Sequence, residues 1–467
     1  MANRQAKKNN KMKVKLILLF AISLLFASCE KDEDITNEVN AKLSFSMDSV
    51  LFDTVFTSIG STSRRLKVYN PNEKAILISQ IKLKGGNSSA YSLNINGLAA
   101  AETSLIKLNG KDSMNVFIKV NINPTNQKLP FIVKDSVEFQ FNGTKKSIPL
   151  VAYGQNANFI TNGSIKSNTT WDNKLPYLIY KSITVEEGAT LTIAPGSKIL
   201  FHSNATMSIK GTLNVSGTKA DSVLFASDRL EDIYSEEPGQ WNGLHFYPQS
   251  KNSQINYAII KNAVAGITSD SLSVNKQPKL LLTNTIIKNM EVVGFLGYQT
   301  SLTGFNNLFY NCGQYLLYGV GGGEYNLKQN TFAGYNPQYA RKTVAVYLSD
   351  FISSTQTDHL TVDMQNNIVW GSLINEFTID KKSPLTSVIA IVKNNLLKTN
   401  ENSYAKNGNI VNVDPAFIGN FNLSKNSPAI NKGLDLTTDA YFNLFLKKDL
   451  RNNSRIFPSE LGCYENN

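Results

Sequence analysis

Cysteine and histidine are scarce in this chain of 467 residues, with only three of each. His202, His245 and His359 stand far apart without metal-ligand spacing, so we predict no metal site and no cofactor. Apart from a cysteine near the N-terminus, only Cys312 and Cys463 remain, and their separation does not show whether they meet. We favour two free, buried thiols over a disulfide, because a chain of this length has enough core without a covalent link.

A strong charge of one sign is missing once the N-terminus is set aside. Residues 1–28 hold six of the 47 Lys and Arg and no acid, so the remaining chain carries 41 basic and 36 acidic side chains. A net charge of +5 is not a nucleic-acid footprint, and we predict no nucleic-acid partner.

The apolar run Leu16–Ala27 is too short to span a bilayer, which needs about 20 apolar residues. It follows a basic stretch and ends in small residues, which is typical of a secretory signal over residues 1–28. Its last residues and the next, LFASC, resemble the lipobox of bacterial lipoproteins. That resemblance implies that Cys29 is acylated, with chains such as palmitate, and becomes the first mature residue. The alternative is a plain secretory signal with a chance cysteine.

The charge cluster Glu30–Asp34 resembles the export signal that places lipoproteins on the outer face of the outer membrane in Bacteroidetes. We therefore expect residues 29–42 to form a flexible tether at the cell surface, with the membrane bound through acyl chains. A soluble linker without such an address is the alternative.

Residues 43–155 alternate in polarity over short segments that turn residues separate, such as Asn70-Pro71-Asn72 and Asn142-Gly143. About seven short strands over this length predict an immunoglobulin-like β-sandwich. The stretch also resembles Ig-like modules of bacterial envelope proteins, which serve as spacers or adhesive surfaces. The expected strands include Arg65–Tyr69, Ala75–Leu83, Thr103–Leu108, Met114–Ile122, Ser136–Phe141 and Ser147–Ala152.

From Ile183 onward, apolar residues come in i, i+2 pairs with turns between them, which predicts a coiled sheet. Residues 183–218 and the segment QWNGLHF (240–246) resemble rungs of bacterial right-handed parallel β-helix proteins, the pectin-lyase-like fold. The resemblance covers residues 165–467. The predicted fold class is therefore all-β, an Ig-like sandwich followed by a right-handed parallel β-helix.

Six later segments share a template around an apolar pair, such as NTIIKN and NNLFYN. A rung of about 22 to 28 residues fits them, with an insertion near 338–361. Asparagine recurs two positions before the second apolar residue at 307, 330, 367 and 395, which predicts a stacked ladder. The pattern does not show which residue of each pair points inward. The second residues are Ile260, Ile287, Phe309, Phe332, Val369 and Leu397.

The chain ends in Asp414–Phe417, then Leu423–Gly433, and finally Gly462–Glu465. These segments are similar to the C-terminal close of β-helix surface proteins. We expect them to form a cap, because a solenoid must hide its last sheet edge.

The sequence contains few candidate catalytic residues. Lys261 and Lys288 occupy equivalent positions on adjacent predicted rungs, and Tyr310 follows. Lysine with tyrosine is the chemistry of a polysaccharide lyase, so these are the candidate catalytic residues; solvated face residues are the alternative. Rungs 255–337 contain few acids (Asp270, Glu291 and Glu324) and no Asp pair, which disfavours a hydrolase.

Aromatic residues are dense between 295 and 339. Tyrosine and tryptophan often line sugar-binding grooves, although structural stacking is the competing interpretation. The candidate ligand-binding residues are Tyr298, Tyr310, Tyr315, Tyr318, Tyr335 and Trp370. A further pattern, Asp-Ser/Thr-apolar, resembles the O-glycosylation acceptor of Bacteroidetes secreted proteins and begins at Asp48, Asp53, Asp112, Asp135, Asp221 and Asp270.

The leading hypothesis is a non-catalytic surface lipoprotein whose β-helix binds a glycan or a host matrix component. A polysaccharide lyase or glycoside hydrolase is the first alternative, and a structural or adhesive stalk with fully buried aromatics is the second. The sequence leaves the ligand and the oligomeric state open.

Overall fold

A computed structural model describes residues 34–126, 130–338, 340–382 and 384–466. The described chain divides into two compact units, one of residues 34–123 and 131–154, the other of residues 124–126, 130 and 155 to the C-terminal end. The proposed signal, Cys29 and the first part of the tether lie outside the described residues.

The first unit is built from two five-stranded antiparallel sheets in the described part of the chain. Alternating side chains from both sheets, such as Ile78, Val116 and Phe139, fill one core, as expected for an immunoglobulin-like sandwich. A short 3₁₀ turn, η1, covers Gly86–Ser88. In spatial order, one sheet is β1 (Ser44–Phe45), β3 (Arg64–Tyr69), β8 (Ser113–Val120), β5 (Tyr91–Ile95) and β6 (Leu98–Ala99); the other is β2 (Val50–Phe56), β10 (Thr144–Gln155), β9 (Phe131–Phe141), β4 (Ile76–Leu83) and β7 (Glu102–Leu108).

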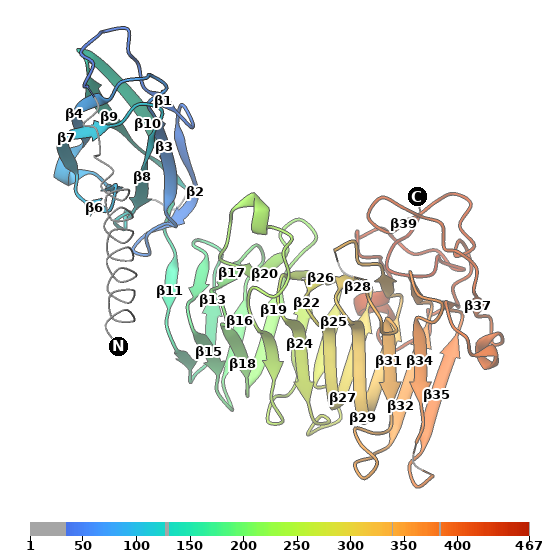
Figure 1. Ribbon diagram of the computed structural model, residues 1–467. Coiled ribbons are helices and arrows are strands. Elements are labelled where there is room, and N and C mark those ends of the chain that lie inside the picture. Colours follow the sequence, from blue (N-terminus) through green and yellow to red (C-terminus); the bar gives the residue numbers. More distant parts are fainter. Residues whose placement is uncertain (1–33, 127–129, 339, 383, 467) are drawn as a thin grey trace, which may run out of the picture. The chain divides into compact units, whose positions relative to one another are not determined.

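The second unit is a parallel β-helix, so the all-β prediction is confirmed. Each rung visits three strand columns, called A, B and C here, and like strands stack in parallel register from rung to rung (Figure 1). The long strands β27 (Val293–Phe305) and β29 (Tyr315–Lys328) run through both A and B and join them into a 16-stranded sheet.

The remaining strands follow this order. Column A holds β12 (Gly163–Ile165), β15 (Ser182–Val185), β18 (Thr206–Ile209), β21 (Gly243–Phe246), β24 (Ala265–Asp270), β31 (Val346–Ser349) and β34 (Phe377–Asp380). Column B holds β13 (Thr169–Trp171), β16 (Thr190–Ile193), β19 (Thr212–Ser216), β22 (Ser253–Asn256), β25 (Leu280–Thr283), β32 (Leu360–Gln365) and β35 (Val388–Lys393). Column C holds β11 (Asn158–Ile160), β14 (Tyr177–Ile179), β17 (Lys198–Phe201), β20 (Val223–Ser227), β23 (Ala258–Lys261), β26 (Ile286–Met290), β28 (Leu308–Cys312), β30 (Thr331–Gly334), β33 (Ile368–Gly371), β36 (Leu396–Leu397) and β37 (Ile410–Val411).

The predicted rung anchors stack in column C in the expected register. Ile260 pairs with Ile287, Ile287 with Phe309, and the series continues without a slip to Leu397. The second residue of each apolar pair points into the core of the helix. The first residue of each pair points outward, which the sequence did not show. At Leu308 this outward residue is covered by the C-terminal segment.

The predicted asparagine ladder is confirmed at the turn between columns B and C. Asn307, Asn330, Asn367 and Asn395 are completely buried, and each donates its main-chain N–H and its Nδ2 to Oδ1 of the next ladder residue. The series ends at Asn409, in a further rung. A second ladder, of Asn262, Asn289 and Asn311, lies at the turn between columns C and A.

The C-terminal segment folds back along the side of the helix (Figure 1, red) and contains β38 (Phe417–Ile418), β39 (Asn422–Leu423) and the π-helical turn η4 (Phe442–Leu446). Asn306 donates to the carbonyl oxygens of Phe445 and Lys448, far from the end of the coil. This segment therefore covers the outward residues of column C as well as contacting the last rungs, a wider role than the edge cap that the sequence predicts.

Candidate functional site

The structure brings Lys261, Lys288 and Tyr310 together as the sequence predicted. They stand at matching positions of β23, β26 and β28, so their side chains form one outward row in column C. The row continues through Ala333 to Trp370. Lys288 Nζ lies 5.8 Å from the centroid of the Tyr310 ring, which is cation–π distance.

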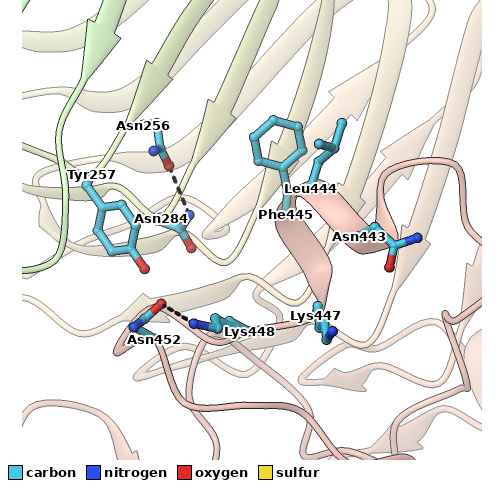
Figure 2. Close-up of a pocket in the computed structure, with 9 residues that line it drawn as sticks. All are labelled: Asn256, Tyr257, Asn284, Asn443, Leu444, Phe445, Lys447, Lys448 and Asn452. Atoms are coloured by element: carbon cyan, nitrogen blue, oxygen red, sulfur yellow. Dashed lines mark hydrogen bonds between the residues drawn. The ribbon is translucent and has the colours of Figure 1, made fainter.

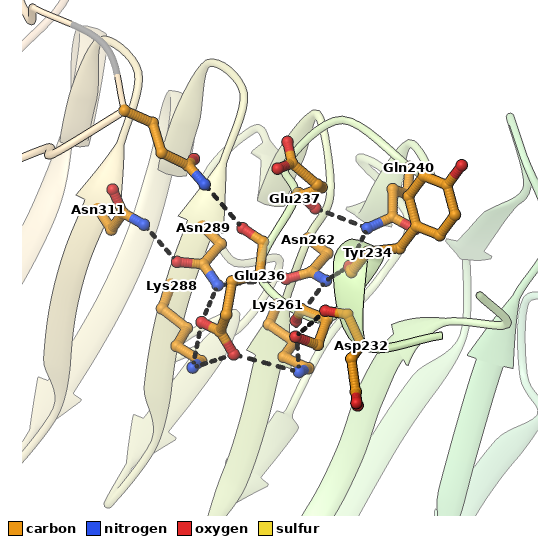
Figure 3. Close-up of polar contacts among 12 residues, drawn as sticks. Asp232, Tyr234, Glu236, Glu237, Gln240, Lys261, Asn262, Lys288, Asn289 and Asn311 are labelled. Carbon is orange, nitrogen blue, oxygen red and sulfur yellow. Dashed lines mark hydrogen bonds and ion pairs between the residues drawn. The ribbon is translucent and has the colours of Figure 1, made fainter. Parts of the chain in front are cut away.

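A loop that the sequence analysis missed crosses this row. It is the strap, residues 228–242 between β20 and β21, and it contains the 3₁₀ turn η2 (Asp232–Tyr234). Glu236 of the strap places its carboxylate 2.7 and 3.0 Å from Lys288 Nζ and 3.6 Å from Lys261 Nζ (Figure 3). Lys261 Nζ also donates to the Ser235 carbonyl oxygen at 2.8 Å.

In the cluster of Lys261, Lys288 and Glu236, the charges of the lysines and of the carboxylate stabilise each other. Burial lowers the pKa of Lys261, with the neighbouring charge of Lys288 acting in the same direction and Glu236 opposing both. Burial raises the pKa of Glu236, but its hydrogen bonds with Lys288 and Asn289 and the lysine charges outweigh this and hold it below its usual range. A lyase needs an unprotonated base that can reach its sugar, and here both lysines are committed to an ion pair.

The predicted aromatic residues divide between two faces. Tyr310, Tyr335 and Trp370 belong to column C and lie beneath or beside the C-terminal segment. Trp370 retains 6% of its exposure and packs against Leu423, so core packing accounts for it. These three therefore do not form one open sugar platform with the others.

Tyr298, Tyr315 and Tyr318 lie on the 16-stranded sheet instead. The Tyr318 ring stacks on Tyr315 at 4.3 Å and on Tyr347 of the next rung at 5.4 Å. Tyr347 lies beyond the aromatic-rich window, which is why the sequence search missed it. A purely structural stalk would have its aromatic residues fully buried, but Tyr298 remains 40% exposed.

A polar groove of about 470 Å³ lies on the outer side of column B. Its floor is made by outward residues of β27, β29 and β32, where Ser301, Glu324 and Thr361 stand in one row and Asn326 beside Asp363 in the next. The loop 275–278 and Tyr441 from the C-terminal segment form its walls.

Some charged side chains in this groove form ion pairs and others do not. Among the described residues, neither Lys276 nor Glu324 has an ion-pair partner. Asp363 instead binds Lys328 at 3.1 Å, and Lys328 also binds Asp439 at 2.5 Å. Asp363 lies outside rungs 255–337, in which the sequence shows few acids, because the inserted loops separate its rung from the preceding one.

Two other hollows are smaller or lie outside the helix. A pocket of about 190 Å³ separates Asn256, Tyr257 and Asn284 from the η4 region (Figure 2), and there Lys448 donates to Asn452 Oδ1. An open hollow in the sandwich is lined by Lys84 and Asp135. In the described ranges, no group of three His, Cys, Asp or Glu side chains is placed to hold a metal ion.

Comparison with known proteins supports the fold of part of the chain. Residues 163–271 match the family model of a pectate-lyase like beta helix domain. None of the curated proteins matches. Within the described residues, no helix has the length and apolarity that crossing a bilayer requires.

Similar solved structures include the YadV chaperone (11% identity, 24% of this chain and 50% of that chain, TM-score 0.17) and a PapD-like domain of human CEP192 (12%, 28% and 95%, TM-score 0.18). A family 123 glycoside hydrolase from Clostridium perfringens is also similar (10%, 27% and 30%, TM-score 0.19). The chain thus spans half or less of the chaperone and the hydrolase. At these TM-scores the similarities carry no argument about activity.

Proposed function

We propose that this protein is a lipid-anchored glycan-binding protein of the bacterial cell surface, with the column B groove as its saccharide site. The observation that carries the proposal is the groove floor, where Glu324, Asn326 and Thr361 present neighbouring polar side chains on rigid strands. Amide, hydroxyl and carboxylate groups at strand spacing can bind the hydroxyls of a sugar ring, because each hydroxyl can both donate and accept a hydrogen bond.

The groove is suited to a chain rather than a small apolar ligand. Its lining is mainly polar, and Lys276 and Glu324 supply one free charge of each sign. Stacked strands repeat at about 4.8 Å, so successive rungs offer equivalent contacts along an extended ligand. The pectate-lyase like match agrees with a carbohydrate ligand, although it covers only residues 163–271.

The location of the protein is part of the proposal and rests on the sequence. Acylation of Cys29 would supply the membrane attachment. The expectation of a flexible tether is wrong for the second half of residues 29–42, because Thr36 donates its main-chain N–H to the Ala75 carbonyl oxygen and Ala41 is buried in the sandwich core. A tether would therefore be confined to the residues before 34.

Glycoside hydrolysis is the second candidate, because the register places Glu324 and Asp363 on adjacent strands two residues apart. Strand geometry puts their Cα atoms roughly 8 Å apart, from which the two carboxyl groups can reach the roughly 6.5–9.5 Å separation that an inverting reaction uses. Asp363, however, is held by Lys328 and by Gln365 Nε2. We therefore place binding before hydrolysis.

Retention of the protein in glycan-loaded gels tests the proposal, using a soluble Cys29→Ala form. Wild-type retention on a neutral or acidic glycan should fall about fivefold in Glu324→Gln and in Thr361→Leu, because a lost hydrogen bond to a ligand costs about 1 kcal/mol. Glu187→Gln changes an exposed carboxylate on a distant turn and is the matched control. Equal retention of all forms would exclude the groove as the saccharide-binding site.

The same mixtures distinguish binding from catalysis. New reducing ends that disappear in Asp363→Asn would establish a hydrolase. Ultraviolet absorbance from unsaturated products that disappears in Lys288→Ala would establish a lyase acting at the lysine row.

A further inference from the structure

Three donors from the β-helix converge on one carboxylate of the strap. Lys288 Nζ and Asn289 Nδ2 lie 2.7 and 2.5 Å from Glu236 Oε2, and Lys261 Nζ lies 3.6 Å from Oε1 (Figure 3). Charge-assisted bonds of this kind are the usual way in which a protein holds a carboxylate.

The donors and the carboxylate are held very differently. Lys261 and Lys288 are paired in register on β23 and β26, and Asn289 belongs to the second asparagine ladder. The two lysine side chains retain only 20% and 18% of their exposure, whereas the Glu236 side chain retains 52%. The donor set is thus part of the rigid coil, and its occupant comes from a solvent-facing loop.

The part of the strap that carries Glu236, residues 231–237, can move away without dismantling the donor set. Besides the Glu236 carboxylate, this part is attached to the coil by main-chain carbonyl oxygens: Tyr234 and Ser235 accept from Asn262 Nδ2, Ser235 also from Lys261 Nζ, and Glu236 from Gln338 Nε2. The rest of the strap stays in place, because Gly239 and Gln240 donate main-chain N–H groups to the coil and Trp241 is completely buried. These bonds do not determine where Lys288 or Asn289 stand, because strand pairing and the ladder do. Two half-buried ammonium groups left without a counter-ion would repel each other, so a departing Glu236 leaves a site that favours another anion.

We propose that Lys261, Lys288 and Asn289 form a second ligand site, which takes the carboxylate of an acidic saccharide in exchange for Glu236. The strap is then a tethered competitor that occupies the site when ligand is scarce. The saccharide assignment rests on the proposed glycan-binding function and on the Tyr310 ring beside Lys288, which packs against Phe421 but is only partly buried, so that some aromatic surface remains next to the anion site. The anion site itself is independent of the column B groove.

The decisive variant is Glu236→Gln, which removes the competing charge and keeps the side-chain shape. Its affinity for a glucuronate-containing oligosaccharide, measured by calorimetry on the purified full chain with Cys29→Ala, should exceed that of wild type by about tenfold or more. Glu237→Gln, one residue along the same strap, should leave the affinity unchanged. Adding Lys288→Ala to Glu236→Gln should abolish the gain. No gain in Glu236→Gln, or a gain that survives Lys288→Ala, would overturn the proposal.

A measurement on the wild-type protein covers the case in which Glu236→Gln unfolds. Saturating oligosaccharide should speed amide hydrogen exchange of residues 231–237, because the ligand displaces the strap; unchanged or slower exchange would contradict this. Binding of poly-glutamate in place of the oligosaccharide would overturn the saccharide assignment. Retention on neutral glycans, which Glu324→Gln tests, reports on the groove separately, so failure of one site does not imply failure of the other.

Discussion

Asn330 donates both its main-chain N–H and its Nδ2 to the same oxygen, Oδ1 of Asn367, each at 2.9 Å. Asn367 repeats the arrangement toward Asn395 and also donates to the Leu327 carbonyl oxygen at 2.8 Å. Every group in this buried row therefore depends on its neighbour in the next rung. The ladder links the rungs by side chains where the backbone turns away from the sheet.

Asn367→Ala should accordingly lower the free energy of unfolding by about 3 kcal/mol. The change leaves the Asn330 N–H without its acceptor, takes one of the two acceptors from Asn330 Nδ2, and removes a donor from the Leu327 carbonyl oxygen. Each unsatisfied buried group costs about 1–3 kcal/mol. Urea denaturation measures the loss, with Asn400→Ala, an exposed asparagine, as control. A loss of less than 1 kcal/mol would show that the ladder is not energetically coupled.

The ladder and the rung anchors could be predicted because they repeat. Ile287, Phe309 and Phe332 recur at nearly equal spacing, and a coil places equally spaced residues in one column. The sequence did not show which way the first residues of the pairs, such as Leu308, point. The segment that covers them is the C-terminal one, more than 100 residues later. Contacts of that range leave no periodic signal in a single sequence.

The candidate site shows the same division. The alignment of Lys261 with Lys288 follows from the rung repeat and was predicted correctly. Glu236 belongs to a non-repeating insertion, so nothing in the sequence connected it with these lysines. The groove was missed for a related reason, because Glu324 and Asp363 become neighbours only when the inserted loops are set aside.

Cys312 and Cys463 should resist thiol reagents in the native protein. Both are free and completely buried, as expected from the sequence, and burial raises the pKa of each to about 12. The thiolate is the reactive form, so at pH 8 we expect almost no reaction with a disulfide reagent. In the Cys29→Ala form, two thiols should react once denaturant is added. Rapid labelling before unfolding would contradict the burial of at least one.

The stability of the protein should be highly sensitive to loss of the ion pair between Arg341 and Glu376. The two side chains are almost fully buried and lie 2.5 Å apart, and Glu376 also accepts from the main-chain N–H of Ala345 and Leu373. Burial raises the pKa of Glu376, and Arg341 opposes that shift. Arg341→Met should cost about 3–5 kcal/mol, because it leaves a buried carboxylate without its counter-charge.

Thermal and urea unfolding measure this cost, and Lys342→Met at the exposed neighbour serves as control. The double change Arg341→Met with Glu376→Leu should recover part of the loss, since no buried charge then remains. A double variant no more stable than Arg341→Met would show that the arginine contributes by packing rather than by charge.

Lys279 should make stability depend on pH in an alkaline window. Its side chain is fully buried, and Nζ donates to the carbonyl oxygens of Tyr247, Pro248 and Asp270. Burial lowers its pKa to about 8 from 10.5, and the charge of Asp270 only partly opposes this. Between these two values the unfolded chain holds the proton more strongly than the folded chain. The free energy of unfolding therefore rises as the pH increases from about 8 toward 10.5, by up to about 3 kcal/mol from this residue.

Comparison with Lys279→Met isolates this contribution, because other titrating groups, including the tyrosines, are common to both proteins. The methionine takes the Nζ donor away from the three carbonyl oxygens, of which Tyr247 keeps the main-chain N–H of Ser250, and this lowers stability by an amount that does not change with pH. Urea denaturation at pH 7, 8, 9 and 10 should show the wild-type protein gaining stability relative to the variant only above about pH 8. Parallel pH profiles would mean that Lys279 keeps its ordinary pKa, and that the three carbonyl oxygens compensate its charge as fully as water does.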